Sequence, residues 1–485
     1  MSSSIILTVI FLYFFGLFVI SSLTTGNNDN KTFFSANKES PWYLVAFGMV
    51  GASLSGITFI SVPGDVGSTQ FTYFQVVLGY LFGYFIVALI LLPIYYKLNL
   101  TSIYEYLKVR FGKVSHKTGA FFFFLSRITG ASFRLYLVAI VLQQFLFSEL
   151  NIPFEITVVF SVLLIWIYTF RGGIKTIVWT DTLQTIFMLI SVVLSIYLIN
   201  ESLNWSFIDF INSDELKTYS NFLVTDSFLE KNHFLKSFVG GMFITICMTG
   251  LDQDMMQKNL TCKSLKDAQK NMIVFSFVLV IVTFIFLLLG ALLFIYSQKS
   301  GIIIPELNGS PNADLLFPEI ALNSNLGSVI GITFLLGLIA AAYSSADSAL
   351  TSLTTSFCVD VINIKNKNQD YQVKIRKRAH LIMSAILIIV IIIFENYLER
   401  SVIDGLLVLA GYTYGPLLGL FSFGIFTNYK IHDKYVWIVT VLSVLSVYLL
   451  ANLNPSYLGG YKIGYELLPI NGLITFLGLI LIRRK

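Results

Sequence analysis

Long apolar runs, separated by short polar stretches, follow one another along almost the whole chain. A helix needs about 20 mostly apolar residues to cross a bilayer, and thirteen runs approach or exceed that length. Their bounds are good to about two to four residues. The predicted spans are residues 3–22, 42–63, 71–96, 118–147, 154–170, 177–200, 235–256, 271–297, 327–358, 379–396, 402–426, 435–452 and 463–482. The pattern therefore predicts an all-α membrane protein with about thirteen transmembrane helices.

Small residues interrupt two of these spans. Residues 42–63 contain the run from Gly51 to Ser55, and residues 235–256 contain Gly250. An unwound segment exposes backbone carbonyls, which bind a cation where they line a cavity, although small residues also serve close helix packing. Matching interruptions in two halves of a transporter indicate inverted repeats around a site at the membrane midplane.

The interrupted spans begin two consecutive groups of five, and this fixes the expected domain plan. The first inverted repeat covers 42–200 and the second covers 235–426. An extra N-terminal helix (3–22) and two C-terminal helices (435–482) complete one transporter domain over 1–485. The first run lacks a basic start and a clear cleavage site, so we expect a retained helix and not a signal peptide.

Composition and charge support this plan. The chain is 56% hydrophobic and only 12% charged, which a soluble protein could not cover. Twenty-four of its 32 Lys and Arg residues fall on one predicted side and six on the other, so we expect the N-terminus outside and the C-terminus in the cytoplasm. The three cysteines are scattered, and the four histidines are expected in loops or at loop edges, which argues against a disulfide framework or a His-ligated metal.

The densest candidate chemistry lies in residues 341–360. Ser344, Asp347, Ser348 and Thr351 follow i, i+3, i+4, i+7 spacing and share one helix face. A carboxylate at the bilayer centre disfavours insertion by roughly 2.5–3.5 kcal/mol. Oxygen ligands suit a hard cation, so this face predicts half of a sodium site. The alternative is a buried helix contact in which neighbouring hydroxyls satisfy Asp347.

Three other charged residues lie in or near spans. Asp181, close to the start of the 177–200 span, is a candidate ion ligand or a helix cap. Arg127 and Arg134 share a helix face, and two arginines cannot face lipid there. They are expected to pair with Asp181 or Asp347, to bind carbonyls, or to hold an anionic substrate. No phosphate loop, nucleophile elbow or metal-ligand cluster occurs in the sequence, so we do not expect an enzyme.

Several motifs resemble the sodium:solute symporter family, which includes the sodium/glucose, proline, pantothenate and sialic acid transporters. They match over nearly the whole chain, in the family's order and spacing. The motifs are Ser55 to Phe59 with Pro63, Arg171 to Ile174 followed by Trp179 to Asp181, Asp252 to Gln257, Ala340 to Ser348, and Gly411 to Pro416. The resemblance implies a five-plus-five inverted repeat of the leucine-transporter type with two broken helices.

The resemblance also implies site residues. A first sodium ion would be held by Gly51, Leu54, Ala341, Ser344 and Ser345, and a second by Asp181, Ser344, Asp347 and Ser348. Some relatives carry a hydroxyl at the position of Asp347, and a second carboxylate there either binds sodium more tightly or shares a proton. Substrate would lie near Ser53, Ser55, Thr58, Tyr73, Gln75, Arg127 and Arg134.

Together these features predict a sodium-coupled symporter that imports a small polar organic solute by alternating access. A sugar, a carboxylated sugar such as sialic acid, an amino acid and a vitamin all remain open as substrates. The alternatives are a proton-coupled symporter of the same fold, or an ion channel without solute coupling. We expect a multi-pass protein of a bacterial inner membrane, with Na⁺ as coupling ion, no nucleic-acid partner and an undetermined oligomeric state.

Overall fold

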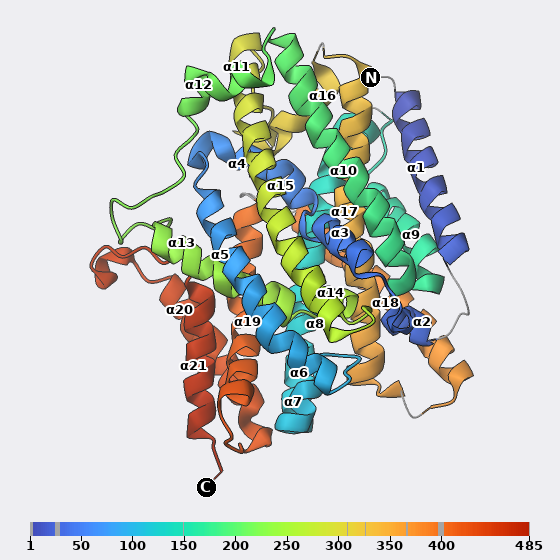
Figure 1. Ribbon diagram of the computed structural model, residues 1–485, viewed down its shortest axis with the longest axis vertical. Helices are drawn as coiled ribbons and strands as arrows, with labels where there is room; N and C mark the ends of the chain where they lie inside the picture. The colour runs from blue at the N-terminus through green and yellow to red at the C-terminus, as the bar shows by residue number, and fades with distance from the viewer. Residues whose placement is uncertain are drawn as a thin grey trace.

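The protein is a bundle of helices that run mostly along its long axis, with the two termini near opposite ends (Figure 1). The computed structural model describes residues 3–24, 30–148, 150–307, 309–324, 326–364, 367–395 and 402–484. The only sheet within them is a small hairpin in which β1 (Glu306–Leu307) pairs antiparallel with β2 (Ser310–Pro311). The expected all-helical class is confirmed, and the side of the membrane on which each terminus lies stays a prediction.

The α-helices have the following bounds. They are α1 (Ser3–Thr24), α2 (Asn30–Ser35), α3 (Trp42–Ser53), α4 (Gly56–Thr69), α5 (Tyr73–Ile86), α6 (Leu92–Lys97), α7 (Glu105–Arg110), α8 (Lys113–Leu142), α9 (Phe154–Gly172), α10 (Ile174–Ser202), α11 (Phe207–Asn212), α12 (Asp214–Lys217), α13 (Phe234–Thr245), α14 (Gln253–Asn259), α15 (Leu265–Ser300), α16 (Leu316–Asn323), α17 (Ser328–Ser356), α18 (Gln369–Glu395), α19 (Val402–Phe426), α20 (Val436–Ala451) and α21 (Leu467–Leu481). Single π-helical turns continue four of them, at η2 (Val87–Leu91), η3 (Gln143–Phe147), η4 (Ile246–Gly250) and η6 (Phe357–Val361). Short 3₁₀ turns lie at η1 (Ala36–Lys38), η5 (Ala313–Leu315), η8 (Asp433–Tyr435) and η9 (Pro455–Leu458).

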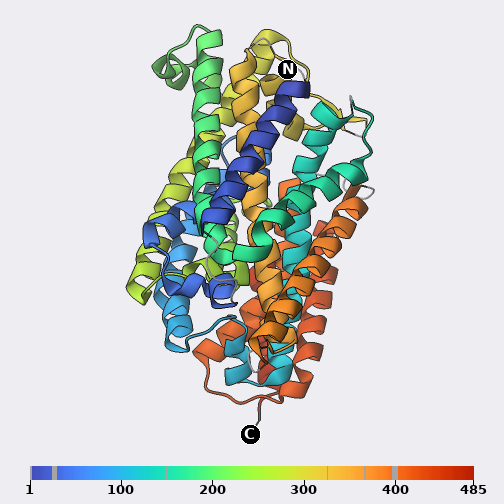
Figure 2. The same ribbon diagram turned by 90° about the vertical axis from the view of Figure 1, so that its right-hand side faces the viewer.

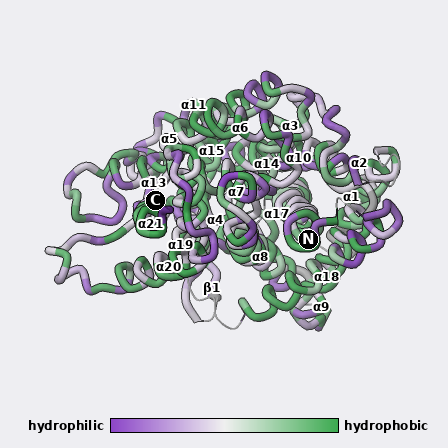
Figure 3. Tube along the Cα trace, turned by 90° about the horizontal axis from the view of Figure 1, so that it is seen from below, coloured by the Kyte–Doolittle hydropathy of each residue, from purple (hydrophilic) through white to green (hydrophobic). Residues whose placement is uncertain are grey.

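Many of the longer helices are apolar enough to cross a membrane. Among the described residues, nine helices are long enough to span, two further spans are bent pairs, and Phe154–Phe170 and Leu467–Leu481 are shorter apolar helices. Large hydrophobic side chains such as Phe11 on α1 and Leu449 on α20 are exposed on the outside of the bundle. Figure 2 shows α1 on this outer surface, and Figure 3 shows hydrophobic stretches around the periphery. The count of thirteen spans stays a prediction.

Both interrupted spans are bent in the structure. The pair α3 and α4 bends by 54°, and the pair Phe234–Gly250 and α14 bends by 67°. The first break leaves helical geometry at Leu54, with φ −79° and ψ 67°, and Ser55 is extended. The second break passes through Asp252, which is extended and whose side chain accepts a hydrogen bond from the amide of Asp254. Asp252 therefore caps α14, so that the helix after the second break begins at a defined residue.

The core centres on α10 and α17, which pack along each other, with α3 against α10. Every residue of α17 from Gly337 to Ser356 is buried, so its polar face meets other helices and not lipid. Small residues permit this approach: a Cβ at Gly337 would lie 2.6 Å from the Cβ of Ser191 on α10. This close crossing sets where the candidate site is built.

The expectation that all four histidines lie in loops or at loop edges is wrong. His380 does not lie at a loop edge but inside α18, where it is buried and forms 3.0 Å hydrogen bonds with the hydroxyls of Thr169 and Thr354. Hydropathy placed the start of this span at residue 379, whereas the helix begins at Gln369. Its first turns are polar, and hydropathy detects only the apolar part of a helix that extends further.

Candidate functional site

The first predicted sodium set converges where α17 crosses the broken end of α3. The Ser345 hydroxyl of α17 donates to the carbonyl of Ala52 at 3.0 Å, which joins the hydroxyl pair of α17 to the unwound segment. Gly51 and Leu54 flank that carbonyl, and Ala341 lies one turn before Ser345 on α17. Carbonyl and hydroxyl oxygens thus gather around a helix break, which is the ligand chemistry that a sodium ion needs.

Gly51 is required where α3 meets α10. A Cβ at this position would collide with the Thr185 hydroxyl of α10 and would lie 3.4 Å from the carbonyl of Asp181. The Thr185 hydroxyl already donates to that Asp181 carbonyl at 2.7 Å, so it has little freedom to move away. The glycine lets the unwound end of α3 come close to the carboxylate-bearing helix.

The second predicted set also comes together, with two residues that the sequence did not suggest, Tyr168 and Lys258. The Ser344 hydroxyl donates to Asp181 Oδ1 at 2.6 Å, and Ser348 donates to Asp347 Oδ1 at 3.3 Å. The Tyr168 hydroxyl donates to Asp347 Oδ2 at 2.8 Å. Lys258 Nζ lies 2.6 Å from Asp181 Oδ2 and forms a buried ion pair with it.

The predicted span 235–256 ends before Lys258 and so assigned this residue to a loop on the cytoplasmic side, which is wrong. The residue lies on α14, and its side chain is 2% exposed. Asp252 restarts a helix after the break, and this short helix turns Lys258 into the protein. The one feature of the sequence that could have indicated a role for Lys258 was its position directly after the motif from Asp252 to Gln257.

The two arginines have different surroundings. Arg127 forms a buried ion pair with Asp254 of α14. The sequence had suggested Asp181 or Asp347 as its partner. Arg134 lies two turns further along α8. The Nε of both arginines has no hydrogen-bond partner among the described residues, but Arg134 also lacks an ion pair there. The guanidinium of Arg127 is therefore held by Asp254 of a neighbouring helix, whereas that of Arg134 has no such carboxylate and can bind a ligand.

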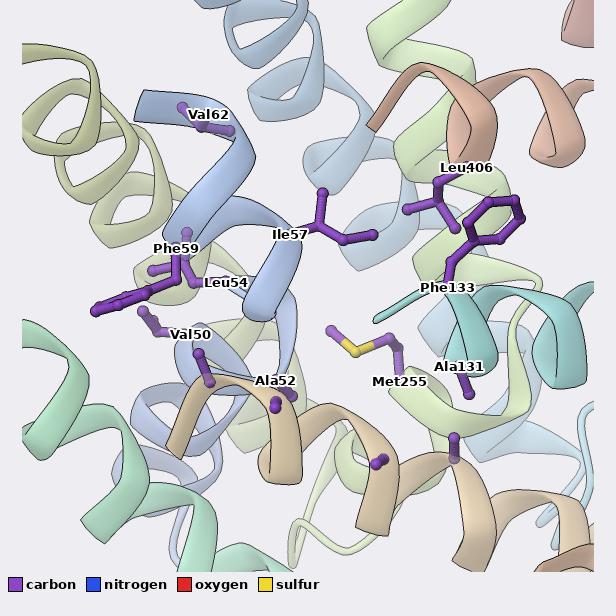
Figure 4. Close-up of a cluster of buried hydrophobic side chains, with 14 of the residues drawn as sticks. Val50, Ala52, Leu54, Ile57, Phe59, Val62, Ala131, Phe133, Met255 and Leu406 are labelled. Atoms are coloured by element: carbon purple, nitrogen blue, oxygen red, sulfur yellow. The ribbon is translucent and has the colours of Figure 1, made fainter. Parts of the chain in front are cut away.

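A cavity of about 110 Å³ lies beside the broken end of α3. Its polar lining includes most of the predicted substrate residues, namely Ser53, Ser55, Thr58, Tyr73, Arg127 and Arg134, together with Tyr80, Tyr84, Thr245, Thr249 and Thr283. Figure 4 shows Ile57, Met255 and Leu406, from three different elements, pointing toward one another as its apolar wall. The cavity thus joins hydroxyl groups, an apolar wall and a cationic group, which suits a small polar anion.

Gln75 lies outside this lining and is occupied elsewhere. Its amide nitrogen donates to the carbonyls of Thr72 and Asn232, each at 3.1 Å. Its side-chain oxygen accepts from the amide of Val224 at 2.9 Å. The side chain therefore anchors the segment between α12 and α13.

The charged groups in the described part of the chain do not form a transition-metal site. Within the described ranges, no group of three or more His, Cys, Asp or Glu side chains is placed to hold a metal ion. The carboxylates that do cluster are paired with Lys258 and Arg127. The groups that are left to bind a cation are the carbonyl and hydroxyl oxygens at the break of α3.

Comparisons with known proteins agree with this arrangement. The family model described as "Sodium:solute symporter family" matches residues 33–431. The sodium/sialic acid symporter NanT of Aliivibrio fischeri is 28% identical, over 91% of this chain and 87% of that protein. The sodium/sialic acid symporter SiaT of Proteus mirabilis is 25% identical, over 91% of this chain and 88% of that protein.

Solved structures share the fold. A substrate-bound, outward-open Na⁺-coupled sialic acid symporter superposes with a TM-score of 0.82 at 21% identity, covering 99% of each chain. A transporter of the nucleobase–cation symport-1 family, in a closed conformation, gives a TM-score of 0.54 at 16% identity over 94% of each chain. The broken-helix bundle is thus an architecture that other solved transporters also have.

Proposed function

The chain belongs to the sodium:solute symporter family, and we propose that the solute it carries with sodium is a small carboxylated sugar of the sialic acid class. The observation that carries this proposal is Arg134, whose side chain lines the cavity and keeps an unpartnered Nε. A guanidinium binds a carboxylate through two parallel hydrogen bonds. The hydroxyl-rich lining offers partners for a sugar, and the two relatives described above are sialic acid symporters.

The coupling ion is Na⁺, and we place it at the break of α3. The proposed ligands are the carbonyls of Gly51, Leu54 and Ala341 and the hydroxyls of Ser344 and Ser345. Support comes from the contact between Ser345 and Ala52, which brings the two halves of this set together. Because the same broken segment lines the cavity through Ser53 and Ser55, bound sodium would order one wall of the substrate pocket.

The cycle is proposed to be alternating access around this site. The broken pairs α3–α4 and Phe234–α14 would be the first members of two inverted five-span repeats, with the N-terminus outside and thirteen spans in all. Symporters of this kind move one part of the bundle against the other around a fixed site. The ion bound between α3 and α17 would join the two parts and favour the state that accepts solute.

The charge carried by the solute sets the driving force. Each positive charge that enters gains about 2.3 kcal/mol per 100 mV of membrane potential. One sodium with a monoanion therefore gains nothing from voltage, and a second sodium would restore that gain. Current recorded during solute uptake separates these two cases.

Ligand-dependent thermal stability of the purified protein tests the proposal. We expect sialic acid to raise the unfolding temperature in sodium chloride but not in choline chloride, because binding of both ligands is linked. Neutral sugars, inositol, proline and pantothenate serve as matched solutes. Stabilisation by one of these instead of sialic acid would reject the proposed solute while leaving sodium coupling intact.

Arg134→Ala tests the residue that carries the proposal. A hydrogen bond to a charged group is worth about 1.5–3 kcal/mol, so solute affinity should fall roughly tenfold to a hundredfold while sodium stabilisation persists. Solute-dependent unfolding shifts in saturating sodium provide the measurement. Unchanged affinity for the carboxylated sugar would remove Arg134 from the binding site.

A further inference from the structure

We infer that the ammonium group of Lys258 occupies the place of a second sodium ion, so that this symporter binds one sodium per transport cycle. The inference rests on the proposed sodium site at the break of α3 and goes beyond it. It replaces the second sodium that the sequence resemblance implied at Asp181, Ser344, Asp347 and Ser348. The lysine is a tethered cation, held by the same carboxylate that would have bound the ion.

The ion pair between Lys258 and Asp181 carries the inference. Lys258 Nζ lies 2.6 Å from Asp181 Oδ2, and the two side chains are 2% and 0% exposed. The Ser344 hydroxyl donates to the other carboxylate oxygen at 2.6 Å. Both oxygens of Asp181 therefore already have partners, one of them a full positive charge. A free sodium at this carboxylate would lie next to the ammonium and be repelled by it.

The second carboxylate of the set is also satisfied. Asp347 accepts hydrogen bonds from Tyr168 at 2.8 Å and from Ser348 at 3.3 Å. The Ser348 hydroxyl is therefore oriented by the neighbouring carboxylate. The ammonium group of Lys258 compensates the charge of the buried Asp181 carboxylate in this cluster.

The protein holds Lys258 in this position from several sides. Gln257 donates to the carbonyl of Phe34 at 2.8 Å and to the Thr355 hydroxyl at 3.0 Å, which joins α14 to α2 and α17. The Thr261 hydroxyl donates to the carbonyl of Lys258 at 2.7 Å. The end of α14 is therefore fixed against its neighbours, and the lysine does not depend on a flexible loop for its placement.

Ser344 connects the lysine to the first sodium site. Its hydroxyl donates its hydrogen to Asp181, so its lone pairs are directed away from the carboxylate and remain for an ion. The pair of Lys258 and Asp181 thus orients a ligand of the proposed first site. Removing the ammonium would open a second cation position next to this ligand without deleting any ligand of the first.

Counting bound radiolabelled sodium on purified full-length protein tests the inference. We expect one sodium per wild-type molecule and two for Lys258→Met, in which an apolar chain of similar length leaves Asp181 without a cation. Lys263→Met is the matched control, because Lys263 is exposed just beyond α14 and its variant should bind one sodium. The slope of unfolding temperature against the logarithm of sodium concentration should roughly double in Lys258→Met alone.

Three outcomes separate this inference from the proposed function. Two sodium ions on the wild type, or one on a folded Lys258→Met, would overturn the inference and leave sodium coupling intact. No sodium on the wild type would reject the proposed sodium site itself. If Lys258→Met does not fold, Lys258→Gln provides the same count, and the double variant Lys258→Met with Asp181→Asn, which lacks both charges, should fold and bind one sodium.

Discussion

The two broken helices bend by similar angles but present different chemistry at the bend. At the break of α3, the groups are neutral: backbone carbonyls near Leu54 and the hydroxyl of Ser345. At the break before α14, the groups are charged: Asp254 pairs with Arg127, and Lys258 pairs with Asp181. A neutral oxygen cluster has capacity for a mobile cation, whereas paired charges are already compensated.

This difference shows how one structural device serves two purposes. Both breaks lie where backbone leaves helical geometry inside a membrane protein, which is tolerated only where other groups satisfy it. At the first break the remaining partner is proposed to be an ion that comes and goes. At the second break the partners are side chains of α8 and α10, which pair with Asp254 and Lys258 of α14.

Removing a charge at the second break should have the largest effect. Arg127→Ala leaves the buried carboxylate of Asp254 unpaired, and breaking such a pair costs about 3–5 kcal/mol of unfolding free energy. Thermal unfolding in detergent should show this loss at every sodium concentration. The exposed pair Lys217–Asp214 offers the control, because Lys217→Ala should cost less than about 1 kcal/mol. Equal losses at both positions would contradict a structural role for the Arg127 pair.

Crowding the first break should have an intermediate effect. Gly51→Ala would drive a Cβ into the Thr185 hydroxyl, and overpacking of this kind costs about 1–3 kcal/mol. Thr185→Ala in the same chain should recover part of the loss, because it removes the atom that collides. Gly16→Ala on α1 is the control, since nothing lies within 4 Å of its added methyl group. If Gly51→Ala and Gly16→Ala unfold at the same temperature, the close contact at Gly51 does not limit stability.

Removing one neutral ligand at the first break should have the smallest effect on stability and a selective effect on sodium. Ser345→Ala loses a hydroxyl that contributes roughly 1 kcal/mol, so sodium affinity should fall by about a factor of five. Sodium titrations followed by unfolding temperature provide the measurement. Ser352→Ala removes a hydroxyl that donates within α17, to Ala349, and should leave sodium affinity unchanged. An unaltered sodium titration of the Ser345 variant would exclude this ligand.

The sequence alone determined the features that depend on local pattern. Apolar run length predicted a helical membrane protein, and small residues predicted breaks in the two spans that bend in the structure. The spacing of Ser344, Asp347 and Ser348 predicted a polar face on α17, which the structure places in the interior. These features follow from a few neighbouring residues, because helix periodicity and insertion into a bilayer are properties of short segments.

Only the tertiary structure decided which charges meet. Lys258 is 77 positions from Asp181 along the chain, and Arg127 is 127 positions from Asp254. Hydropathy placed Lys258 in a loop, since it detects apolar length and not a short helix that turns back into the protein. Likewise, two of the three partners of Gln75, Val224 and Asn232, lie about 150 positions away, in the segment that it anchors. Pairing at such separations depends on how α8, α10, α14 and α17 cross, which no local pattern contains.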